Sequence, residues 1–380
     1  MSRLSSVNSI CASPARNPRR RGVRFRLAVG ALGIGVALLA TALFLPSKAA
    51  AARTRFYVAP TGSNANPGTT TQPWRTIQKA LDTLGPGQTA SVRGGTYWEE
   101  ATMSRSGQAT AWITLRAYPG ERPVVTGRLK ITGSYFRVRG FRFRGSSLNA
   151  TSALVYLSGA THVVLIRNKI ASGQMSGIYI GDSGGLSRNV TIVRNYIHDN
   201  GTEANQDHGI YCDNLSGGLI ANNIIVGNKA RGVQLYEDAK HVIVTQNTIV
   251  GNLTGVGVGG EGSSTSDDNV IANNIIAFNR KFGISTYWPN AVGSGNVAIR
   301  NLLYANADSN FYISRGGLVN QSNIFAPPGF VDRRRRNFHL RAGSRAINTA
   351  VARYSQGVDY DGDSRPQGLA SDIGMDEWVR

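Results

Sequence analysis

Acid, imidazole, phenol and guanidinium side chains lie close together in one part of this sequence. Asp207 and His208 end a polar segment, and Tyr211 follows in the next apolar run. Arg231 comes twenty residues later. Groups of these kinds suit β-elimination on a uronate sugar. An imidazole can remove a proton near neutral pH, a phenol can protonate the leaving oxygen, and an arginine can hold a carboxylate with two hydrogen bonds.

The residue types suggest a role for each member of this group. We expect His208 to act as the base, Tyr211 as the acid and Arg231 as the ligand of the substrate carboxylate. Asp207 could orient His208 or ligate Ca²⁺, and the sequence requires no other cofactor.

Two other interpretations of these residues stay open. Hydrolysis of a glycosidic bond would need two carboxylates across that bond, and Asp207 with Asp213 or Glu237 is the available pair. A purely structural role is the third possibility, because a histidine before a strand often caps a bend and surface acid–arginine pairs are common. A non-catalytic glycan-binding protein would need only the exposed tyrosines and arginines.

A repeated asparagine motif predicts the elements that position these groups. Six segments read Asn-x-(Ile/Leu), at intervals of 27, 28, 24, 27 and 27 residues, beginning at Asn168, Asn195, Asn223, Asn247, Asn274 and Asn301. A fixed period of this length is typical of a stacked solenoid. The apolar runs in each repeat are too short for helices and rich in Val and Ile, so we expect each repeat to form one coil of a parallel β-helix.

The repeated asparagines favour a structural role. We expect them at sharp bends between strands, because asparagine tolerates the left-handed backbone conformation. Stacked asparagine side chains can also hydrogen-bond in a ladder along the axis. None of them is a catalytic candidate.

One coil departs from the period. The distance from the repeat asparagine to the glycine that begins the next strand is 8 or 9 residues in four repeats, but 14 residues from Asn195 to Gly209. The segment 198–208 therefore bulges from its coil, and it holds two of the five histidines in the chain and three acids. Insertions in solenoids form loops on one face and often carry function.

Stacking supplies neighbours to this inserted loop. Coils about 4.8 Å apart bring together residues that are distant in the sequence. The substrate-binding candidates on the adjacent coils and strands are Tyr179, Asp213, Lys229, Gln234, Tyr236 and Glu237.

Residues 1–52 have the pattern of a secretory signal peptide. Several arginines precede an uncharged run at 27–45, and an alanine-rich stretch follows. The run is long enough for an uncleaved membrane anchor, which is the alternative. We expect a secreted, extracellular protein that contacts a membrane only if this segment is retained.

Charge indicates the kind of partner. The chain carries a formal net charge of +20, and loss of the eight Lys and Arg in the export segment leaves +12. This charge favours a polyanion, and for an exported protein an acidic polysaccharide rather than nucleic acid. Cys212 would be the single remaining cysteine, which excludes a disulfide framework and predicts a small buried side chain.

The ends of the predicted solenoid need covers. Residues 53–380 should form one monomeric β-helix domain, with 53–100 as the N-terminal cap and first coil. Apolar spacing predicts a helix over 73–84 that lies over the open core. The polar segment 330–380 should close the other end.

Several segments resemble a known group of proteins. The run Phe56–Thr69, the helix near Trp74 and the segment Val92–Tyr97 are similar to the opening of exported right-handed parallel β-helix proteins of the pectate-lyase-like superfamily. The endings Asp359–Pro366 and Asp372–Gly374 resemble their closing segment. The resemblance implies an all-β, right-handed parallel β-helix with an N-terminal capping helix.

The resemblance leaves the activity open, because the superfamily includes lyases, hydrolases, epimerases and proteins of unknown role. No catalytic residue is transferred from it. The resemblance and the residues of the inserted loop together lead us to expect a polysaccharide lyase that cleaves an acidic, uronate-containing glycan.

Overall fold

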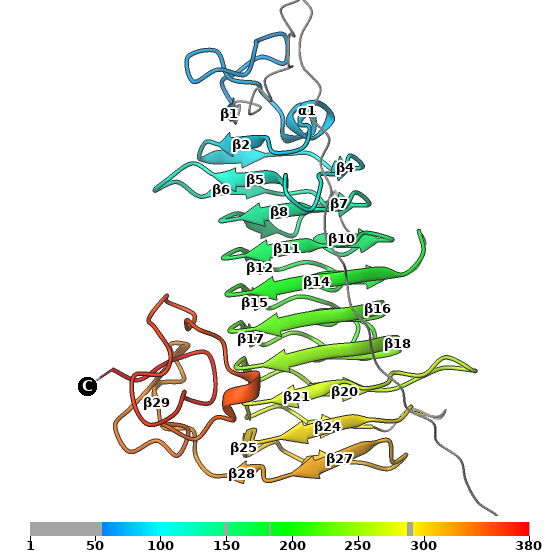
Figure 1. The fold of residues 1–380 in the computed structure, drawn as a ribbon, viewed down its shortest axis with the longest axis vertical. Helices are drawn as coiled ribbons and strands as arrows, with labels where there is room; N and C mark the ends of the chain where they lie inside the picture. Colours follow the sequence, from blue (N-terminus) through cyan, green and yellow to red (C-terminus); the bar gives the residue numbers. More distant parts are fainter. Residues whose placement is uncertain (1–54, 148–150, 182–183, 287–291, 380) are drawn as a thin grey trace, which may run out of the picture. The chain divides into compact units, whose positions relative to one another are not determined.

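The computed structural model describes residues 55–147, 151–181, 184–286 and 292–379. The predicted export segment at 1–52 lies outside the described residues. The described chain winds through successive coils of parallel strands (Figure 1). This architecture confirms the predicted parallel β-helix.

The coils have three faces, here called A, B and C; faces A and B belong to one 18-stranded sheet, and face C is a separate 10-stranded sheet. Face A contains β4 (Ala101–Met103), β7 (Leu129–Ile131), β10 (Val155–Ser158), β13 (Ile178–Gly181), the first parts of β16 (Ile210–Ala221) and β18 (Arg231–Thr245), β20 (Thr254–Val258), β23 (Phe282–Ser285) and β26 (Ser309–Tyr312). Face B contains β1 (Arg55–Val58), β2 (Thr89–Val92), β5 (Ile113–Ala117), β8 (Phe136–Arg139), β11 (Val163–Ile166), β14 (Ser187–Val193), the later parts of β16 and β18, β21 (Val270–Ala272), β24 (Asn296–Ile299) and β27 (Leu318–Gln321). Face C contains β3 (Gly95–Tyr97), β6 (Pro123–Val125), β9 (Arg142–Arg144), β12 (Lys169–Ala171), β15 (Tyr196–His198), β17 (Ile224–Val226), β19 (Thr248–Val250), β22 (Ile275–Ala277), β25 (Leu302–Tyr304) and β28 (Ile324–Phe325).

The core is a set of aliphatic columns that run through the coils. Register places Ile178, Ile210, Val233, Val256 and Ile284 above one another on face A, and all five side chains are fully buried. Because alternate residues of a strand point to opposite sides of a sheet, the residues between them face outward. Cys212 also points inward and is completely buried as a free thiol, as predicted.

Two ladders of asparagine side chains fix the turns. The first holds Asn168, Asn195, Asn223, Asn247, Asn274, Asn301 and Asn323 between faces B and C. In each step one Oδ1 accepts the backbone N–H and the side-chain N–H of the asparagine one coil earlier, at 2.7–3.1 Å. The second ladder joins Asn200, Asn228, Asn252, Asn279 and Asn306 between faces C and A. The predicted ladders are confirmed.

The predicted backbone conformation of the ladder asparagines is wrong. The positive φ angles fall one residue earlier, for example at Arg167 (55°), Arg194 (58°) and Gln246 (50°). The ladder asparagine must direct its side chain into the turn to bond with both neighbouring coils, so the preceding residue takes the left-handed bend instead.

The helix α1 spans Ile77–Thr83, shorter than the predicted 73–84. Thr76 caps it by accepting the N–H of Lys79, and the Glu99 carboxylate accepts the N–H of Ile77 at 2.8 Å. The buried side chains of Ile77, Ala80 and Leu81 belong to the same apolar core as the coils. The helix therefore packs on the first coils, as a cap should.

The C-terminal segment lies beside the later coils, whereas the sequence predicted a cover over their end (Figure 1). β29 (Phe330–Asp332) and β30 (Asn337–Leu340) form an antiparallel pair, and a short 3₁₀ helix covers Ala352–Tyr354. A second apolar cluster joins this segment to the outer side of face C, through Ile224, Val226, Val250, Ile275, Leu302, Phe338, Leu340, Ile373 and Met375. These outward apolar residues of face C explain its position.

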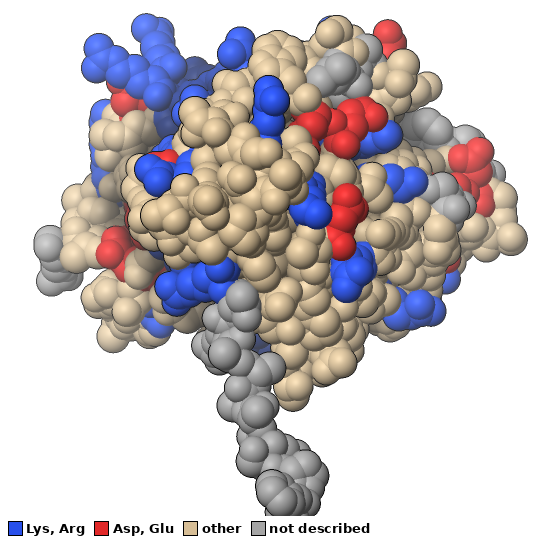
Figure 2. All heavy atoms as spheres, turned by 90° about the horizontal axis from the view of Figure 1, so that it is seen from above, with Lys and Arg blue, Asp and Glu red and all other residues tan. Residues whose placement is uncertain are grey.

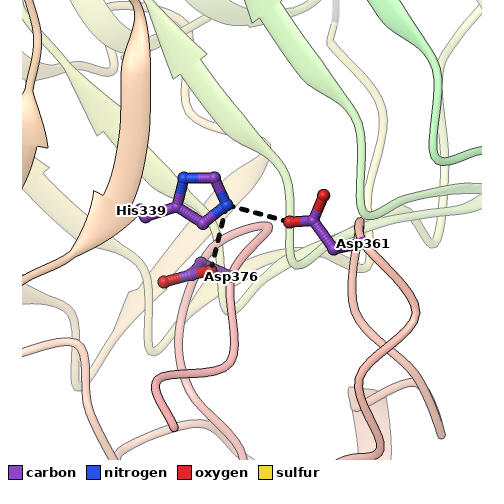
Figure 3. A group of neighbouring side chains, drawn as sticks. All are labelled: His339, Asp361 and Asp376. Carbon is purple, nitrogen blue, oxygen red and sulfur yellow. Dashed lines mark hydrogen bonds and ion pairs between the residues drawn. The ribbon is translucent and has the colours of Figure 1, made fainter.

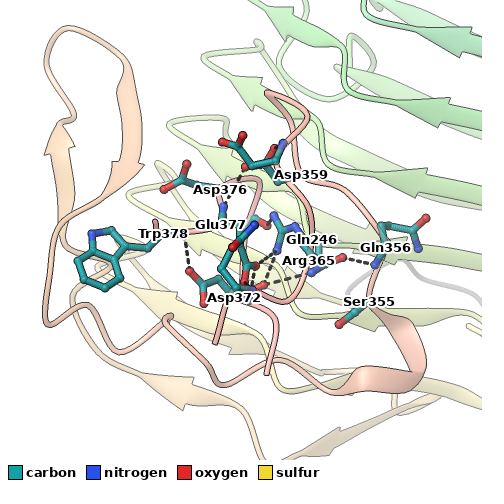
Figure 4. A network of polar contacts seen from close by, with 12 residues as sticks. Gln246, Ser355, Gln356, Asp359, Arg365, Asp372, Asp376, Glu377 and Trp378 are labelled. Carbon is teal, nitrogen blue, oxygen red and sulfur yellow. Dashed lines mark hydrogen bonds and ion pairs between the residues drawn. The ribbon is translucent and has the colours of Figure 1, made fainter. Parts of the chain in front are cut away.

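A buried arginine organises the end of this segment (Figure 4). The Arg365 side chain donates to the carbonyl oxygens of Asp372 (2.7 Å) and Gly374 (2.8 Å) and lies 3.4 Å from the Glu377 carboxylate. The side chain of Gln246, in the turn after β18, also donates to the Asp372 carbonyl. The network attaches the segment to the solenoid.

The first testable consequence concerns the first asparagine ladder. We expect Asn247→Ala to lower the free energy of unfolding by about 3 kcal/mol, because it leaves buried donors of Asn223 and the Ile220 carbonyl without partners. Urea unfolding would measure this. Gln321→Ala, which removes an exposed side-chain amide of β27, is the matched control and should change stability by less than about 0.5 kcal/mol. Equal effects of the two substitutions would contradict a stabilising ladder.

Candidate functional site

A cavity of about 570 Å³ opens on face A at the inserted loop. Its floor consists of outward residues in register on successive strands, Tyr156, Tyr179, Tyr211 and Gln234. The rings of Tyr156 and Tyr179 are stacked with centroids 5.2 Å apart, and Tyr211 follows at 5.1 Å. The remaining wall includes Arg128, residues 151–153, Met175, Ser176, Asn205, Gln206, His208, Arg231, Tyr236 and Glu261.

The structure brings together six of the residues predicted for this site. His208, Tyr211, Arg231, Tyr179, Gln234 and Tyr236 all line the cavity. They come from the inserted loop and three adjacent strands, so the arrangement depends on coil stacking. The sequence did not single out Tyr156 or Glu261. Tyr156 could have been found from its register with Tyr179, whereas Glu261 lies in a connecting loop after β20 that carries no repeat signal.

Arg231 is the buried cation of this cavity. Its side chain is 2% exposed, and Nη1 donates to the Asn205 carbonyl of the inserted loop at 3.1 Å. Burial lowers the pKa of Arg231 to about 10, since a charged guanidinium loses hydration there. The stem of Arg231 passes over Gly257, where an added Cβ would lie 2.9 Å from Cδ. A side chain on that residue would displace the guanidinium.

His208 is held as a neutral imidazole with one defined tautomer. Its Nδ1 accepts the backbone N–H of Arg231 at 3.2 Å, so the ring proton lies on Nε2. Burial, together with the charge of Arg231, lowers the pKa of His208 well below its ordinary value. The predicted role of His208 as the base is therefore corrected, because its remaining ring nitrogen is a donor.

Tyr211 is a protonated phenol. Burial is the main cause of its raised pKa, and the nearby charge of Asp213 adds to it. The His208 ring meets the Tyr211 ring edge to face, with centroids 4.8 Å apart. The Tyr211 hydroxyl can therefore serve as a proton donor near neutral pH.

The predicted carboxylates have other partners. Asp207 is 2% exposed, and its Oδ2 accepts the backbone N–H groups of Thr202 (2.8 Å) and Glu203 (2.6 Å). Asp207 thus closes the inserted loop, and its described hydrogen bonds do not include one to His208. Its predicted catalytic and Ca²⁺-binding roles stay predictions. Asp213 accepts the Tyr179 hydroxyl at 2.5 Å, and its other oxygen lies 3.4 Å from the Glu237 N–H. Asp213 and Glu237 stand beside the cavity but are not part of its lining.

Lys229 is also absent from the lining of the cavity. Its side chain is exposed, and its backbone joins the second turn by donating to the Asn200 carbonyl. Glu261 is the carboxylate within the lining, where it accepts the Tyr236 hydroxyl. The cavity therefore combines two guanidinium groups, those of Arg128 and Arg231, with one imidazole, one carboxylate and several phenols among its described residues.

Potential metal ligands gather at a different place. Among the described residues, His339, Asp361 and Asp376 bring ligand atoms within 4.8 Å of one another (Figure 3). Nε2 of His339 lies 2.9 Å from Asp361 and 3.8 Å from Asp376. Burial lowers the pKa of His339, but the hydrogen bond to Asp361 and the charges of Asp376, Asp361 and Asp359 outweigh it and raise the pKa. The close approach of these groups is explained by ion pairs between a protonated His339 and the two carboxylates. Ca²⁺ binding by the protein stays a prediction.

The comparison with known proteins decides the family. Residues 56–323 match the family described as "Pel9A-like, right handed beta helix region". The match spans more than half of the chain. The chain belongs to this family. Its fold is therefore the right-handed parallel β-helix that the sequence predicted.

Relatives of this Pel9A-like chain include both named and uncharacterised proteins. Pectate lyase L of Paenibacillus polymyxa (strain SC2) is 27% identical over 311 residues, which cover 70% of this chain and 67% of that protein. Uncharacterized protein YwoF of Bacillus subtilis (strain 168) is 26% identical over 200 residues, which cover 47% of this chain and 43% of that protein. The chain thus spans less than half the length of the latter relative.

Solved structures support the same fold. The crystal structure of pectate lyase Pel9A has a TM-score of 0.61 with this Pel9A-like chain at 15% identity, and the match covers 86% of this chain and 96% of that one. No helix within the described ranges has the length and apolar composition to span a membrane.

The buried imidazole gives a testable pH dependence. Because the pKa of His208 is lowered in the folded state, the unfolded chain binds this proton more readily below about pH 6.5. His208 should therefore favour folding at neutral pH and lose this contribution on acidification, by up to about 1.4 kcal/mol per pH unit. Urea unfolding of wild type and His208→Gln at pH 7, 6 and 5 would reveal a smaller loss in the variant. His241→Gln, at an exposed position, should retain the wild-type loss, and parallel profiles for wild type and His208→Gln would refute the assignment.

Proposed function

We propose that this protein is a secreted polysaccharide lyase that cleaves an acidic, uronate-containing glycan by β-elimination in the face A cavity. The observation that carries the proposal is the buried Arg231 guanidinium beside two uncharged proton donors, His208 and Tyr211, over a floor of tyrosine rings. The family and the relative named Pectate lyase L support it.

Arg231 would bind the carboxylate of the reacting sugar. A guanidinium presents two parallel N–H groups that match a carboxylate, and such a pair is stronger where water is excluded. Burial of Arg231 has an electrostatic cost, visible in its lowered pKa. A substrate carboxylate would offset this cost. The guanidinium would also stabilise the negative charge that develops on the substrate carboxylate as the neighbouring carbon loses its proton.

The elimination itself needs a base and an acid. Glu261 is the carboxylate in the cavity lining, and we assign it the role of base in place of His208. It would take the proton from the carbon next to the carboxylate. The released electron pair forms a double bond to the adjacent carbon, whose bond to the glycosidic oxygen breaks. The phenol of Tyr211 gives its proton to that oxygen.

His208 and the tyrosine floor would position the substrate. The Nε2–H of His208 can donate to a sugar hydroxyl or carboxylate oxygen. The stacked rings of Tyr156 and Tyr179, with the tilted ring of Tyr211 beside them, offer apolar surfaces with polar edges, which suit a sugar ring that is apolar on one face. This floor follows the solenoid axis, so a glycan chain bound there would cross several coils.

The two alternatives have weaker support from the cavity. A glycoside hydrolase needs two carboxylates across the bond, and the described lining holds Glu261 without a second one. A binding protein would not need a buried arginine and two donors at one point. Export to the extracellular space, through cleavage at the end of residues 1–52, is part of the proposal.

Substitutions in the cavity test this function. We expect wild-type protein to generate the absorbance of unsaturated uronate on at least one of pectate, alginate or glycosaminoglycans. Tyr211→Phe should lower kcat about 100-fold or more with little change in KM, because it removes the proton donor and keeps the ring. Arg231→Lys should mainly raise KM, since an ammonium group cannot form the paired contact. Tyr135→Phe, a hydroxyl deletion outside the cavity lining, is the matched control.

The assays should run with added Ca²⁺ and with a chelator, which tests the predicted ion directly. Reducing ends released without the absorbance would identify a hydrolase. Binding without cleavage of any of these glycans would identify a binding protein, and full activity of Tyr211→Phe would reject the assigned acid.

A further inference from the structure

A second groove, of about 600 Å³, lies along the turns between faces B and C. Seven cationic residues line it: Arg116, Arg122, Arg139, Arg142, Arg167, Lys169 and Arg194. We call it the cationic groove. It is separate from the face A cavity, with which it shares no lining residue. Lys and Arg side chains are spread over the face seen along the solenoid axis, with patches of Asp and Glu among them (Figure 2).

The cations of this groove follow the coil period. Arg116 and Arg139 are register partners at the ends of β5 and β8 on face B. Arg142 and Lys169 are register partners at the starts of β9 and β12 on face C. Register partners in adjacent coils lie one strand spacing apart, about 4.8 Å. The groove therefore presents positive charges in rows parallel to the solenoid axis.

Two further arginines extend these rows at the turns themselves. Arg167 and Arg194 occupy equivalent positions before Asn168 and Asn195 of the first ladder, both with positive φ. Arg194 Nε donates to the Tyr360 carbonyl at 2.8 Å, and Arg167 Nη2 donates to the Asp361 carbonyl at 3.2 Å. The C-terminal segment thus holds both guanidinium groups at one end of the groove.

The positive charge of the groove is only partly balanced by nearby carboxylates of the described chain, such as Asp361. None of the seven cations forms an ion pair there. The two carboxylates in the lining are already engaged, Glu121 with Arg93 and Asp361 with His339. Burial and then the charge of Arg167 lower the pKa of Arg194, so these cations raise one another's cost.

Hydrogen-bond donors in the groove also lack partners. Nη2 of Arg194 and Nε of Arg142 are inaccessible to solvent and have no hydrogen bond in the structure. A buried donor without an acceptor costs about 1–3 kcal/mol. An arginine-rich surface that served only solubility would extend its guanidinium groups into water. The groove instead aligns them and withdraws some donors from solvent.

We propose that the cationic groove is a second, non-catalytic binding site for a linear polyanion, namely an acidic glycan chain. A small anion would contact one or two of the seven cations, whereas a polymer with a charge on each unit can follow rows that repeat with the coils. The choice of a glycan over another polyanion rests on the proposed function. Such a site would retain the enzyme on its polymeric substrate between cleavage events, and its binding weakens with salt.

Neutralising the groove tests this proposal. Arg122→Gln/Arg139→Gln removes two exposed cations that make no side-chain hydrogen bond, and Arg167→Gln/Arg194→Gln removes the two at the turns. Both would be made in the Tyr211→Phe background, so that the polymer stays intact. We expect each pair to raise the dissociation constant for polygalacturonate at least fivefold in affinity electrophoresis, and high salt to abolish the difference. Arg315→Gln/Arg334→Gln, two exposed arginines outside the groove, should bind like the parent protein.

The result can be separated from that of the proposed function. In the wild-type background, Arg122→Gln/Arg139→Gln should cleave short uronate oligomers at the parental rate and keep the parental unfolding temperature. Arg167→Gln/Arg194→Gln should cleave them at the parental rate but unfold at a lower temperature, because it removes two hydrogen bonds to the C-terminal segment. Unchanged polymer binding by all groove variants would overturn the second site even if cleavage is observed. Groove-dependent binding without cleavage would retain the site and reject the lyase. Equal groove-dependent retention by single-stranded DNA of similar charge would overturn the glycan assignment.

Discussion

Axial hydrogen bonding between coils is the constraint on which the rest of this structure depends. Strand pairing alone would leave the turns free to shift, but the buried asparagine ladders tie the turns on both sides of face C to those of the neighbouring coils, from Asn168 onward. An asparagine supplies an acceptor and two donors, and each ladder member uses both kinds. The register of all three faces follows from these turns. Outward residues consequently form columns along the axis, such as Tyr156, Tyr179 and Tyr211, although these residues lie far apart in the sequence.

Chemistry requires a departure from this regularity. The five-residue insertion before Gly209 lifts a loop away from the column, and Asp207 holds the loop closed by accepting backbone N–H groups. The loop then offers the Asn205 carbonyl to Arg231 on the next coil, while the backbone of Arg231 fixes the tautomer of His208. Loop and strand therefore position each other. An arginine that would otherwise extend into solvent is kept buried beside a protonated phenol.

The period in the sequence was enough to predict the fold, because a repeat of short apolar runs can bury its side chains only by stacking. It also predicted the coil that carries the cavity and six lining residues, since alternation and register place a side chain without knowledge of its rotamer. The period could not predict the direction in which the Asp207 carboxylate points, because that direction depends on hydrogen bonds inside the loop. Glu261 was missed because the connection after β20 has no repeat to align it. The position of the C-terminal segment depends on outward apolar residues such as Ile224 and Ile275. In three-residue strands that are apolar throughout, the sequence does not show which side chains point outward and which point into the core.

The two cation sites differ in the physical basis of their selectivity. Arg231 is buried and desolvated, so in the proposed function it would favour a single well-placed carboxylate. The seven cations of the cationic groove are partly hydrated and repeat with the coils, so each contact is weak and their sum depends on the length of the bound chain. A solenoid can carry both kinds of site, because its period produces, on one side, a regular surface that a regular polymer could follow. The single interruption of that period creates the irregular pocket that a reaction needs on another side.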